Sequence, residues 1–253
     1  MPAISLVVVL QVIAVVHLFR TGRDQRWLFL IIFVPLVGSI AYFIVEVLPS
    51  FHNSPGARRA LKRAQSVMDP GRDLRENTLN YERSQNVETA SKLAAELTKA
   101  GRHAEAIQVC NSARTGLFED DPKILLALAK AQSAAGDHGA AIATLDYLRE
   151  KNPDFRSAHG HLVYTRALEE TGETERALEE YAALAKYYPG AEARVRQAML
   201  YKKLGQTAKA AELFEAVLKD ARLAPKHFQR SEREWIELAK RESREASGQS
   251  GSR

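Results

Sequence analysis

Apolar residues follow two different patterns along the chain, one on each side of about residue 50. The N-terminal part contains two nearly continuous apolar stretches, residues 3–19 and 27–47, whose strongly polar or ionisable residues are Gln11, His17 and Glu46. A helix rises ~1.5 Å per residue, so about 20 residues cross a hydrocarbon core of ~30 Å. The pattern therefore predicts two transmembrane helices joined by the short loop 20–26.

The C-terminal part has apolar positions at helical spacing, arranged in units that repeat. In each unit a glycine is followed five residues later by an alanine, and successive glycines are 35, 36 and 33 residues apart. This period is typical of stacked helical pairs, so each unit is predicted to be helix A, a tight turn at the glycine, and helix B. The glycine and alanine pairs are Gly101 with Ala106, Gly136 with Ala141, Gly172 with Ala177, and Gly205 with Ala210.

Further positions in each unit have the size expected of helix packing residues. Seven residues before the glycine the side chain is small, nine residues after it comes a packing residue, and twelve residues after it comes another. In chain order these sets are Ala94, Ala129, Thr165 and Ala198; Cys110, Leu145, Tyr181 and Phe214; and Ala113, Leu148, Leu184 and Val217. Pro153 and Pro189 stand where helix B should end.

This register resembles the tetratricopeptide repeat, and the resemblance covers roughly residues 86–221. It implies an α-solenoid that binds other polypeptides and carries no catalytic chemistry. The sequence departs from the family where a bulky aromatic residue is usual near the start of helix A, and it lacks the final proline in the first and last units. The residues at these positions are Ala90, Leu125, His161 and Arg194, and then Phe118 and Arg222.

A second resemblance concerns roughly the first 65 residues. The stretch 26–43, with Trp27, Pro35 and Gly38, followed by a basic helix at 57–63, is similar to the N-terminal membrane hairpin of bacterial cardiolipin synthases. In that family the hairpin precedes a phospholipase-D-type domain, whose motif places a lysine two residues after a histidine. No histidine of this chain has a lysine at that position. The resemblance therefore implies a membrane anchor without an active site.

These patterns predict an all-α chain with five parts. They are a two-span membrane anchor at 1–49, a basic juxtamembrane stalk at 50–86, four repeats at 87–221, a capping helix at 222–246 and a disordered Ser/Gly-rich tail at 247–253. The capping helix is expected because Phe228, Trp235, Ile236 and Ala239 form an apolar stripe on a charged segment.

The charge distribution bears on the membrane more than the net charge of +5 does. Basic residues beside a membrane are attracted to anionic headgroups and favour the cytoplasmic side. The stalk carries Arg58, Arg59, Lys62 and Arg63, whereas the loop between the spans carries Arg20, Arg23 and Arg26. We place the repeats in the cytoplasm because the larger cluster follows the second span. No aromatic residue alternates with these charges, so nucleic acid is not an expected partner.

The sequence contains no pattern that predicts a cofactor or a metal. Cys110 is the only cysteine and occupies a repeat packing position, which indicates a buried thiol. His159 and His161 are two residues apart, so on a helix they point in different directions and cannot share one ion without distortion.

Helix A side chains should line a concave groove that holds an extended or helical peptide with an acidic component. The predicted groove residues are Lys123, Leu126, Lys130, His159, Leu162, Arg166, Glu169, Met199 and Lys202. The groove does not match the dicarboxylate clamp of some tetratricopeptide domains, because Ser91, Leu126, Leu162 and Val195 stand where that clamp would place lysine. Charged groove residues could equally form an ordinary solvated surface.

The predicted function is that of a scaffold or adaptor that recruits another protein to the bacterial inner membrane, with two spans and cytoplasmic repeats. The hairpin suggests a setting in envelope or phospholipid metabolism by analogy alone. The alternative is a periplasmic chaperone of the cytochrome-c-maturation type, which also combines membrane spans with tetratricopeptide repeats. The absence of a recognisable nucleophile, base or phosphate-binding loop argues against an enzyme.

Overall fold

The computed structural model describes residues 12, 15, 16, 18, 20 and 69–250 of the 253 residues. The chain divides into two compact units, Met1–Asp73 and Leu74–Arg253. Of the predicted spans, only Val12, Val15, Val16 and Leu18 are described, and they are helical; the rest of 3–19 and all of 27–47 lie outside the described residues. Within the described part, no helix combines the length and apolarity needed to cross a membrane.

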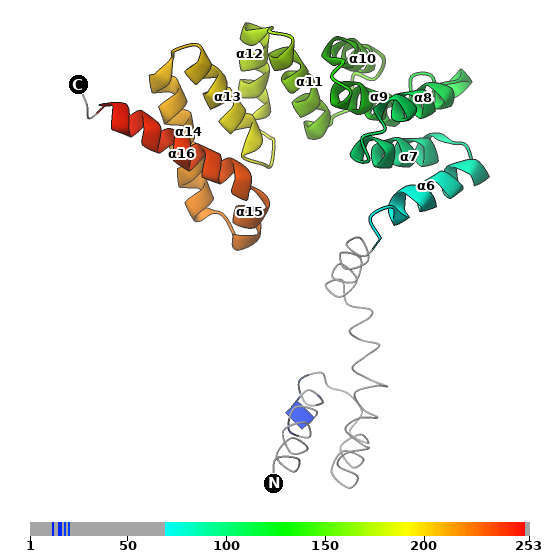
Figure 1. Cartoon of the computed structure of the whole chain (residues 1–253), viewed down its shortest axis with the longest axis horizontal. Coiled ribbons are helices and arrows are strands. Elements are labelled where there is room, and N and C mark those ends of the chain that lie inside the picture. The colour runs from blue at the N-terminus through cyan, green and yellow to red at the C-terminus, as the bar shows by residue number, and fades with distance from the viewer. Residues whose placement is uncertain (1–11, 13–14, 17, 19, 21–68, 251–253) are drawn as a thin grey trace. The chain divides into compact units, whose positions relative to one another are not determined.

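The second unit is built of helices, and no strand occurs among its described residues (Figure 1). Four antiparallel pairs follow one another, each consisting of a helix A and a helix B. Their bounds are α7 (Val87–Lys99) with α8 (His103–Ala113), α9 (Pro122–Ala134) with α10 (His138–Lys151), α11 (Ala158–Glu170) with α12 (Thr174–Leu184), and α13 (Glu192–Lys203) with α14 (Thr207–Leu223). They are flanked by α6 (Arg72–Arg83), α15 (Lys226–Ser231) and α16 (Arg233–Ser250), and the short helix η2 (Gly116–Phe118) lies between α8 and α9.

Local signals explain where the A helices begin. The side chain of Asn86 accepts a hydrogen bond from the Thr89 N–H, and the Thr89 side chain bonds back to the backbone of Asn86, which forms a capping box at α7. Asp121 caps α9, with Pro122 in the first turn, and Ser157 caps α11. These contacts satisfy backbone N–H groups that have no partner inside the helix.

The turn inside each pair depends on a left-handed backbone. The four repeat glycines have φ values of 76° at Gly101, 84° at Gly136, 81° at Gly172 and 73° at Gly205. A Cβ atom in this conformation is strained, whereas glycine adopts it freely. The spacing of the glycines thus reflects the places where helix A must end and the chain must reverse.

Replacing Gly136 with alanine is expected to reduce the free energy of unfolding by about 1–2 kcal/mol, because the backbone is left-handed there. No atom lies within 4 Å of a Cβ added at Gly136, so the cost is conformational and not steric. Gly139 is the matched control: it lies in α10, has no positive φ, and also has open space around an added Cβ. Gly139→Ala should be neutral or stabilising by up to about 1 kcal/mol. Urea unfolding of both variants tests this difference, and equal effects would contradict it.

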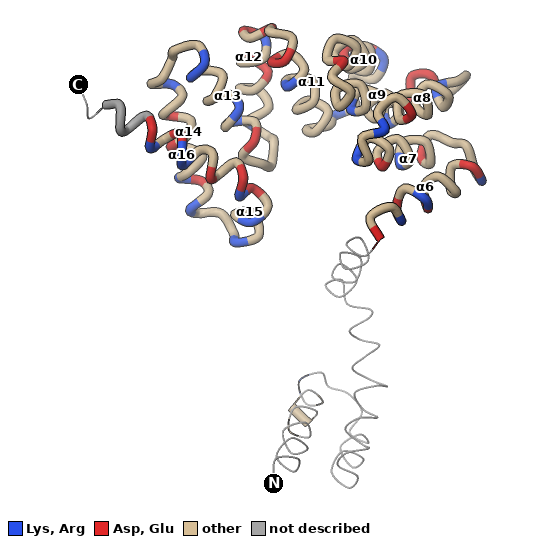
Figure 2. The backbone as a smooth tube through the Cα atoms, in the orientation of Figure 1, with Lys and Arg blue, Asp and Glu red and all other residues tan. Residues whose placement is uncertain are grey.

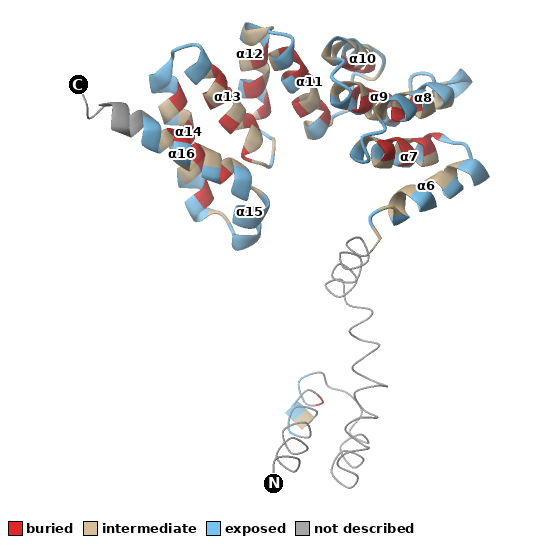
Figure 3. Ribbon diagram, viewed as in Figure 1, coloured by how far each residue is buried: buried red, intermediate tan, exposed pale blue. Residues whose placement is uncertain are grey.

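The interior consists of three apolar clusters along the array. The buried residues are coloured red on the helices in Figure 3. The first lies among α7, α8 and α9, and Leu74 and Tyr81 of α6 pack against it. The second joins α9 to α13, and the third joins α13 and α14 to α16. Cys110 is fully buried in the first cluster. Burial raises the pKa of its thiol to about 12, so the group stays protonated near neutral pH.

The C-terminal region differs from the predicted single capping helix at 222–246. Helix α14 continues to Leu223, and Ala224 adopts an extended backbone because Pro225 follows it. Two helices, α15 and α16, come next and meet at Glu232, whose carboxylate accepts a hydrogen bond of 2.9 Å from the Ala191 N–H. This contact ties the junction to the start of α13. Helix α16 extends to Ser250, into the tail for which composition predicts disorder.

Candidate functional site

The repeat-packing residues lie at the positions that the spacing predicts for them. The four glycines occupy the turns between helices A and B, and the four alanines are buried in helix B. Ala106, Ala141 and Ala177 are 0% exposed and Ala210 is 2% exposed. The predicted membrane-surface residues Arg58, Arg59, Lys62 and Arg63 lie outside the described residues.

Ion pairs between successive A helices involve most of the predicted groove charges. Lys123 of α9 reaches Glu88 of α7 at 3.4 Å. On α11, Arg166 pairs with Glu192 at 3.7 Å. Each of these pairs joins neighbouring repeats, so the charges also stabilise the stacking of one unit on the next. Lys123 and Glu88 are both exposed, and a pair of this kind contributes only about 0–1 kcal/mol.

The same connection continues toward the C-terminus. Glu169 of α11 lies 3.5 Å from Arg196 of α13 and accepts a hydrogen bond of 2.6 Å from the buried Tyr181 hydroxyl. Lys202 of α13 bonds to Glu242 and, at 3.0 Å, to Glu245 of α16. Two carboxylates of helix α16 therefore pair with Lys202, the cation that the sequence analysis places in the last part of the predicted groove.

Two of the apolar residues predicted to line the groove pack in or against the apolar clusters of the interior. Leu162 is only 6% exposed and belongs to the middle cluster, so the prediction that it lines an open groove is wrong. Met199 is half-buried and packs against the C-terminal cluster. His159 stays exposed, and its ring is perpendicular to that of Tyr188 at a centroid distance of 5.8 Å. The spacing placed these residues on A helices, but it did not show which side chains remain accessible.

Lys130 differs from the other groove cations. Within residues 69–245 it makes no hydrogen bond and no ion pair, and desolvation lowers the pKa of its ammonium group. Lys123, Leu126 and Lys130 lie on one face of α9, because they are three and four residues apart. This face offers one uncompensated cation next to a half-buried leucine.

The structure also contains a pocket that the sequence did not predict. It has a volume of about 360 Å³ and lies between the second and third repeats. Leu126 is the predicted groove residue that lines it. The complete lining is Leu126, Leu145, Leu148, Arg149, Phe155, Arg156, Ser157, Gly160, His161, Tyr164, Glu180, Ala183 and Tyr187. Apolar and aromatic side chains predominate, and a few polar groups accompany them, which is the usual composition of a binding pocket.

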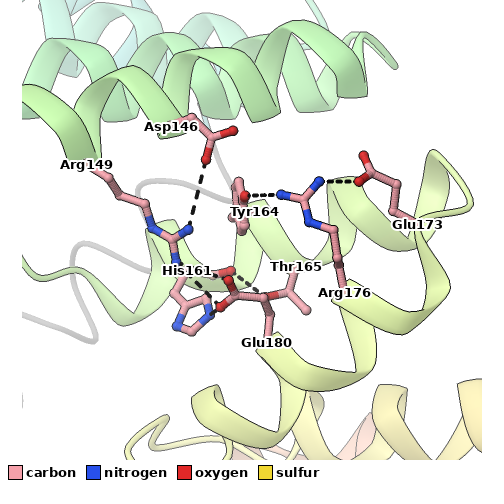
Figure 4. A network of polar contacts seen from close by, with 8 residues as sticks. All are labelled: Asp146, Arg149, His161, Tyr164, Thr165, Glu173, Arg176 and Glu180. Atoms are coloured by element: carbon pink, nitrogen blue, oxygen red, sulfur yellow. Dashed lines mark hydrogen bonds and ion pairs between the residues drawn. The ribbon is translucent and has the colours of Figure 1, made fainter.

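A polar network occupies one wall of this pocket (Figure 4). The Glu180 carboxylate lies 2.5 Å from Nε2 of His161 and 3.3 Å from the guanidinium of Arg149. The other ring nitrogen of His161 contacts the hydroxyl of Tyr187. Arg149 also stacks over the Tyr164 ring, with 4.4 Å between its Cζ and the ring centroid. These contacts hold the wall in one arrangement before any ligand binds.

Three further residues, Arg156, Gly160 and Tyr187, help to define this pocket. Arg156 donates hydrogen bonds to the backbone carbonyls of Pro153, at 2.5 Å, and Phe155, at 3.3 Å, and meets no carboxylate among the described residues. Gly160 allows α9 and α11 to approach closely, because an added Cβ would lie 2.9 Å from Cδ1 of Leu126. Tyr187, in the segment after α12, is 56% exposed at the pocket rim.

The pocket lies on a different side of α11 from the predicted groove. Gly160, His161 and Tyr164 line it. Successive helix positions are about 100° apart, so these three residues lie opposite the predicted groove residues His159 and Arg166. One signal in the sequence points to the pocket: His161 stands where the family usually has a bulky aromatic residue.

No group of three or more histidine, cysteine, aspartate or glutamate residues in the described part could hold a metal ion.

Comparisons with known proteins support the repeat register. The tetratricopeptide repeat family matches residues 97–163 and, in a second match, residues 192–221. No curated protein matches the sequence.

Several solved structures share the fold. A thermophilic TPR protein of Thermus thermophilus is 21% identical over 74% of this chain and 96% of its own, with a TM-score of 0.52. A part of MamA from Desulfovibrio magneticus RS-1, from residue 41 to its end, is 15% identical over 64% of this chain and 91% of its own, also with a TM-score of 0.52. A crystal structure of MamA is 21% identical over 66% and 94%, with a TM-score of 0.50. The chain contains tetratricopeptide repeats, and these form an all-α solenoid.

Proposed function

We propose that this chain is a membrane-anchored scaffold that binds a segment of another protein through its repeats and has no catalytic activity of its own. Stacked helical repeats present extended surfaces to partner chains. The observation that carries the proposal is the pocket between the second and third repeats. It combines an apolar lining with Arg156, whose guanidinium has no carboxylate partner among the described residues.

The chemistry of the pocket defines the segment that would fit. Leu145, Leu148 and Phe155 offer a surface for one aliphatic or aromatic side chain. Arg156 would pair with an acidic residue close to that side chain in the partner. The expected ligand is therefore an extended or helical segment of the partner protein in which an apolar residue stands next to an acidic one. Because the network of Arg149, His161 and Glu180 is already formed, binding would require little reordering of this wall.

A pocket-filling variant tests the proposal. A photo-crosslinking residue at Tyr187 first identifies the bound protein, and the affinity of the purified pair is then measured. Ala183 is exposed and lines the pocket, so Ala183→Trp should fill it without disturbing the interior. We expect the partner's affinity to fall by about tenfold or more, as for the loss of one anchoring contact. Ala182→Trp, next to it and exposed but outside the lining, should leave affinity unchanged.

A competing surface is tested in the same assay. Reversing two charges on the A helices, with Lys130→Glu and Arg166→Glu, should leave binding largely intact if the pocket is the site. Loss of binding in this double variant, together with normal binding by Ala183→Trp, would contradict the pocket and favour the predicted groove.

The membrane part of the proposal rests on the sequence. Residues 3–19 and 27–47 would span the bacterial inner membrane, and Arg58, Arg59, Lys62 and Arg63 would bind anionic headgroups on the cytoplasmic side. Envelope or phospholipid metabolism is the setting suggested by the hairpin's resemblance. Paired reporters fused after Arg253, one active only in the cytoplasm and one only outside it, test this topology. A periplasmic signal would contradict it and favour the chaperone of the cytochrome-c-maturation type.

A further inference from the structure

A second cavity lies at the C-terminal end of the repeats, among α14, α15 and α16. Its volume is about 460 Å³. Leu218, Ala221 and Ile236 provide its apolar lining, and Gln229 contributes a side-chain amide. The remaining lining residues are charged: Arg222, Lys226, Arg230, Arg233, Glu237 and Lys240. Five cations and one carboxylate thus surround a space of the size that holds a small ligand.

The charges of this cavity are not balanced within the described part of the chain. Glu237 bonds to Lys240 at 2.7 Å, and this contact, with a smaller contribution from Arg233, lowers the pKa of the Glu237 carboxyl. Arg222, Lys226 and Arg230 have no hydrogen bond or ion pair from their side chains to any described residue. Basic residues are visible on α15 at this end of the molecule (Figure 2).

Several arginines in and beside the repeat helices behave differently, because each pairs with a carboxylate of a described residue. They are Arg102, Arg149, Arg166, Arg176, Arg194 and Arg196. Arg222, Lys226 and Arg230 instead lie together around one cavity, without a carboxylate partner among the described residues. They repel one another there, and an anion bound among them would remove that repulsion.

We propose that this cavity binds a dianionic phosphate group, carried either by a free metabolite or by a lipid headgroup. Guanidinium groups offer planar pairs of N–H donors that match phosphate oxygens, and a lysine adds a compact positive charge. The apolar side chains of Leu218, Ala221 and Ile236 would contact the non-polar part of the ligand. An acidic polypeptide would need a longer surface than this cavity offers. The proposal is independent of the pocket between the second and third repeats.

The test uses the purified full chain in a non-ionic detergent. Isothermal titration calorimetry measures binding of pyrophosphate as the free anion, and mixed micelles that contain phosphatidic acid supply the lipid headgroup. Sulfate and polyglutamate are the comparison anions. The cavity variant is Arg222→Gln with Arg230→Gln, and the matched control is Arg83→Gln with Lys186→Gln. The two control residues are exposed, lie outside the cavity and make no side-chain ion pair with a described residue.

Saturable binding of pyrophosphate or of phosphatidic acid is expected, and the probe that binds identifies the source of the phosphate. The cavity variant should weaken it by about tenfold or more, because charge-assisted contacts from two guanidiniums are lost. The control variant should change it by less than about twofold, as is usual for solvated surface charges. Unchanged thermal unfolding of both variants shows that the fold is intact.

Three results with the phosphate and sulfate probes would overturn the proposal. They are absence of binding to both phosphate probes, equal weakening by the cavity and control variants, and sulfate affinity equal to that of pyrophosphate. Binding of polyglutamate alone, sensitive to the cavity variant, would likewise overturn it and assign the cavity to an acidic protein segment. Loss of partner binding in Ala183→Trp has no bearing on these outcomes, so the two sites can fail separately.

Discussion

Replacing Tyr181 with alanine is expected to lower the free energy of unfolding by about 3–5 kcal/mol, the largest effect of any single change considered for this chain. Tyr181 is 0% exposed and is among the largest fully buried side chains. It belongs to the middle cluster, which joins α9 to α13, so its loss would leave a cavity where several repeats meet. Urea unfolding of the full chain in detergent, followed by circular dichroism, measures the effect.

Tyr181→Phe separates packing from hydrogen bonding in the same position. The phenylalanine ring keeps the packing but removes the 2.6 Å hydrogen bond to Glu169, so a loss of only about 1 kcal/mol is expected. A Phe variant that is as unstable as the Ala variant would contradict the packing account.

The contribution of Tyr181 to the free energy of unfolding depends on pH with a defined sign. Burial, with a further contribution from Glu169, raises the pKa of Tyr181 above its ordinary value. The unfolded phenol ionises near pH 10, whereas the folded one remains protonated there. The contribution of Tyr181 to stability is therefore complete below about pH 10 and is lost as the pH rises further. Tyr181→Phe should make stability less sensitive to pH in this alkaline range than it is in the unmodified chain.

Replacing Ala141 with leucine is expected to cost about 1–3 kcal/mol through overpacking. Ala141 is 0% exposed and lies in the first turns of α10, just after the turn at Gly136. A larger side chain there must push α10 away from the helices around it, and in a solenoid each unit is stabilised mainly by its neighbours. Chemical unfolding compared with the unmodified chain gives the difference directly.

Ala143→Leu is the control for this prediction. Ala143 lies on the same helix but is exposed, so the substitution should change stability by no more than about 0.5 kcal/mol. If both leucine variants were equally stable, the small residue after each turn would not be needed for close helix packing.

The groove charges and the pocket beside His161 differ in how well the sequence predicts them. The predicted groove charges do lie on A helices, but Arg166 and Lys202 pair with residues of the next repeat and of α16. The pocket beside His161 was not predicted at all, although the missing aromatic residue at that position was visible in the sequence. A pocket depends on the space left between three or more helices, and a linear pattern does not specify that space.

The sequence by itself determined the repeat units of this protein. A left-handed turn favours glycine, and a close helix contact favours a small side chain. Both requirements are set by neighbouring residues of the chain, so these residues recur at a fixed spacing in the sequence. Only the tertiary structure decided which charges pair, where the C-terminal helix breaks and where cavities remain. Lys202 meets Glu242 across 40 positions of the chain, and the Glu232 carboxylate reaches Ala191 across 41. Such contacts depend on how whole helices stack, and helix stacking is a property of the assembled array.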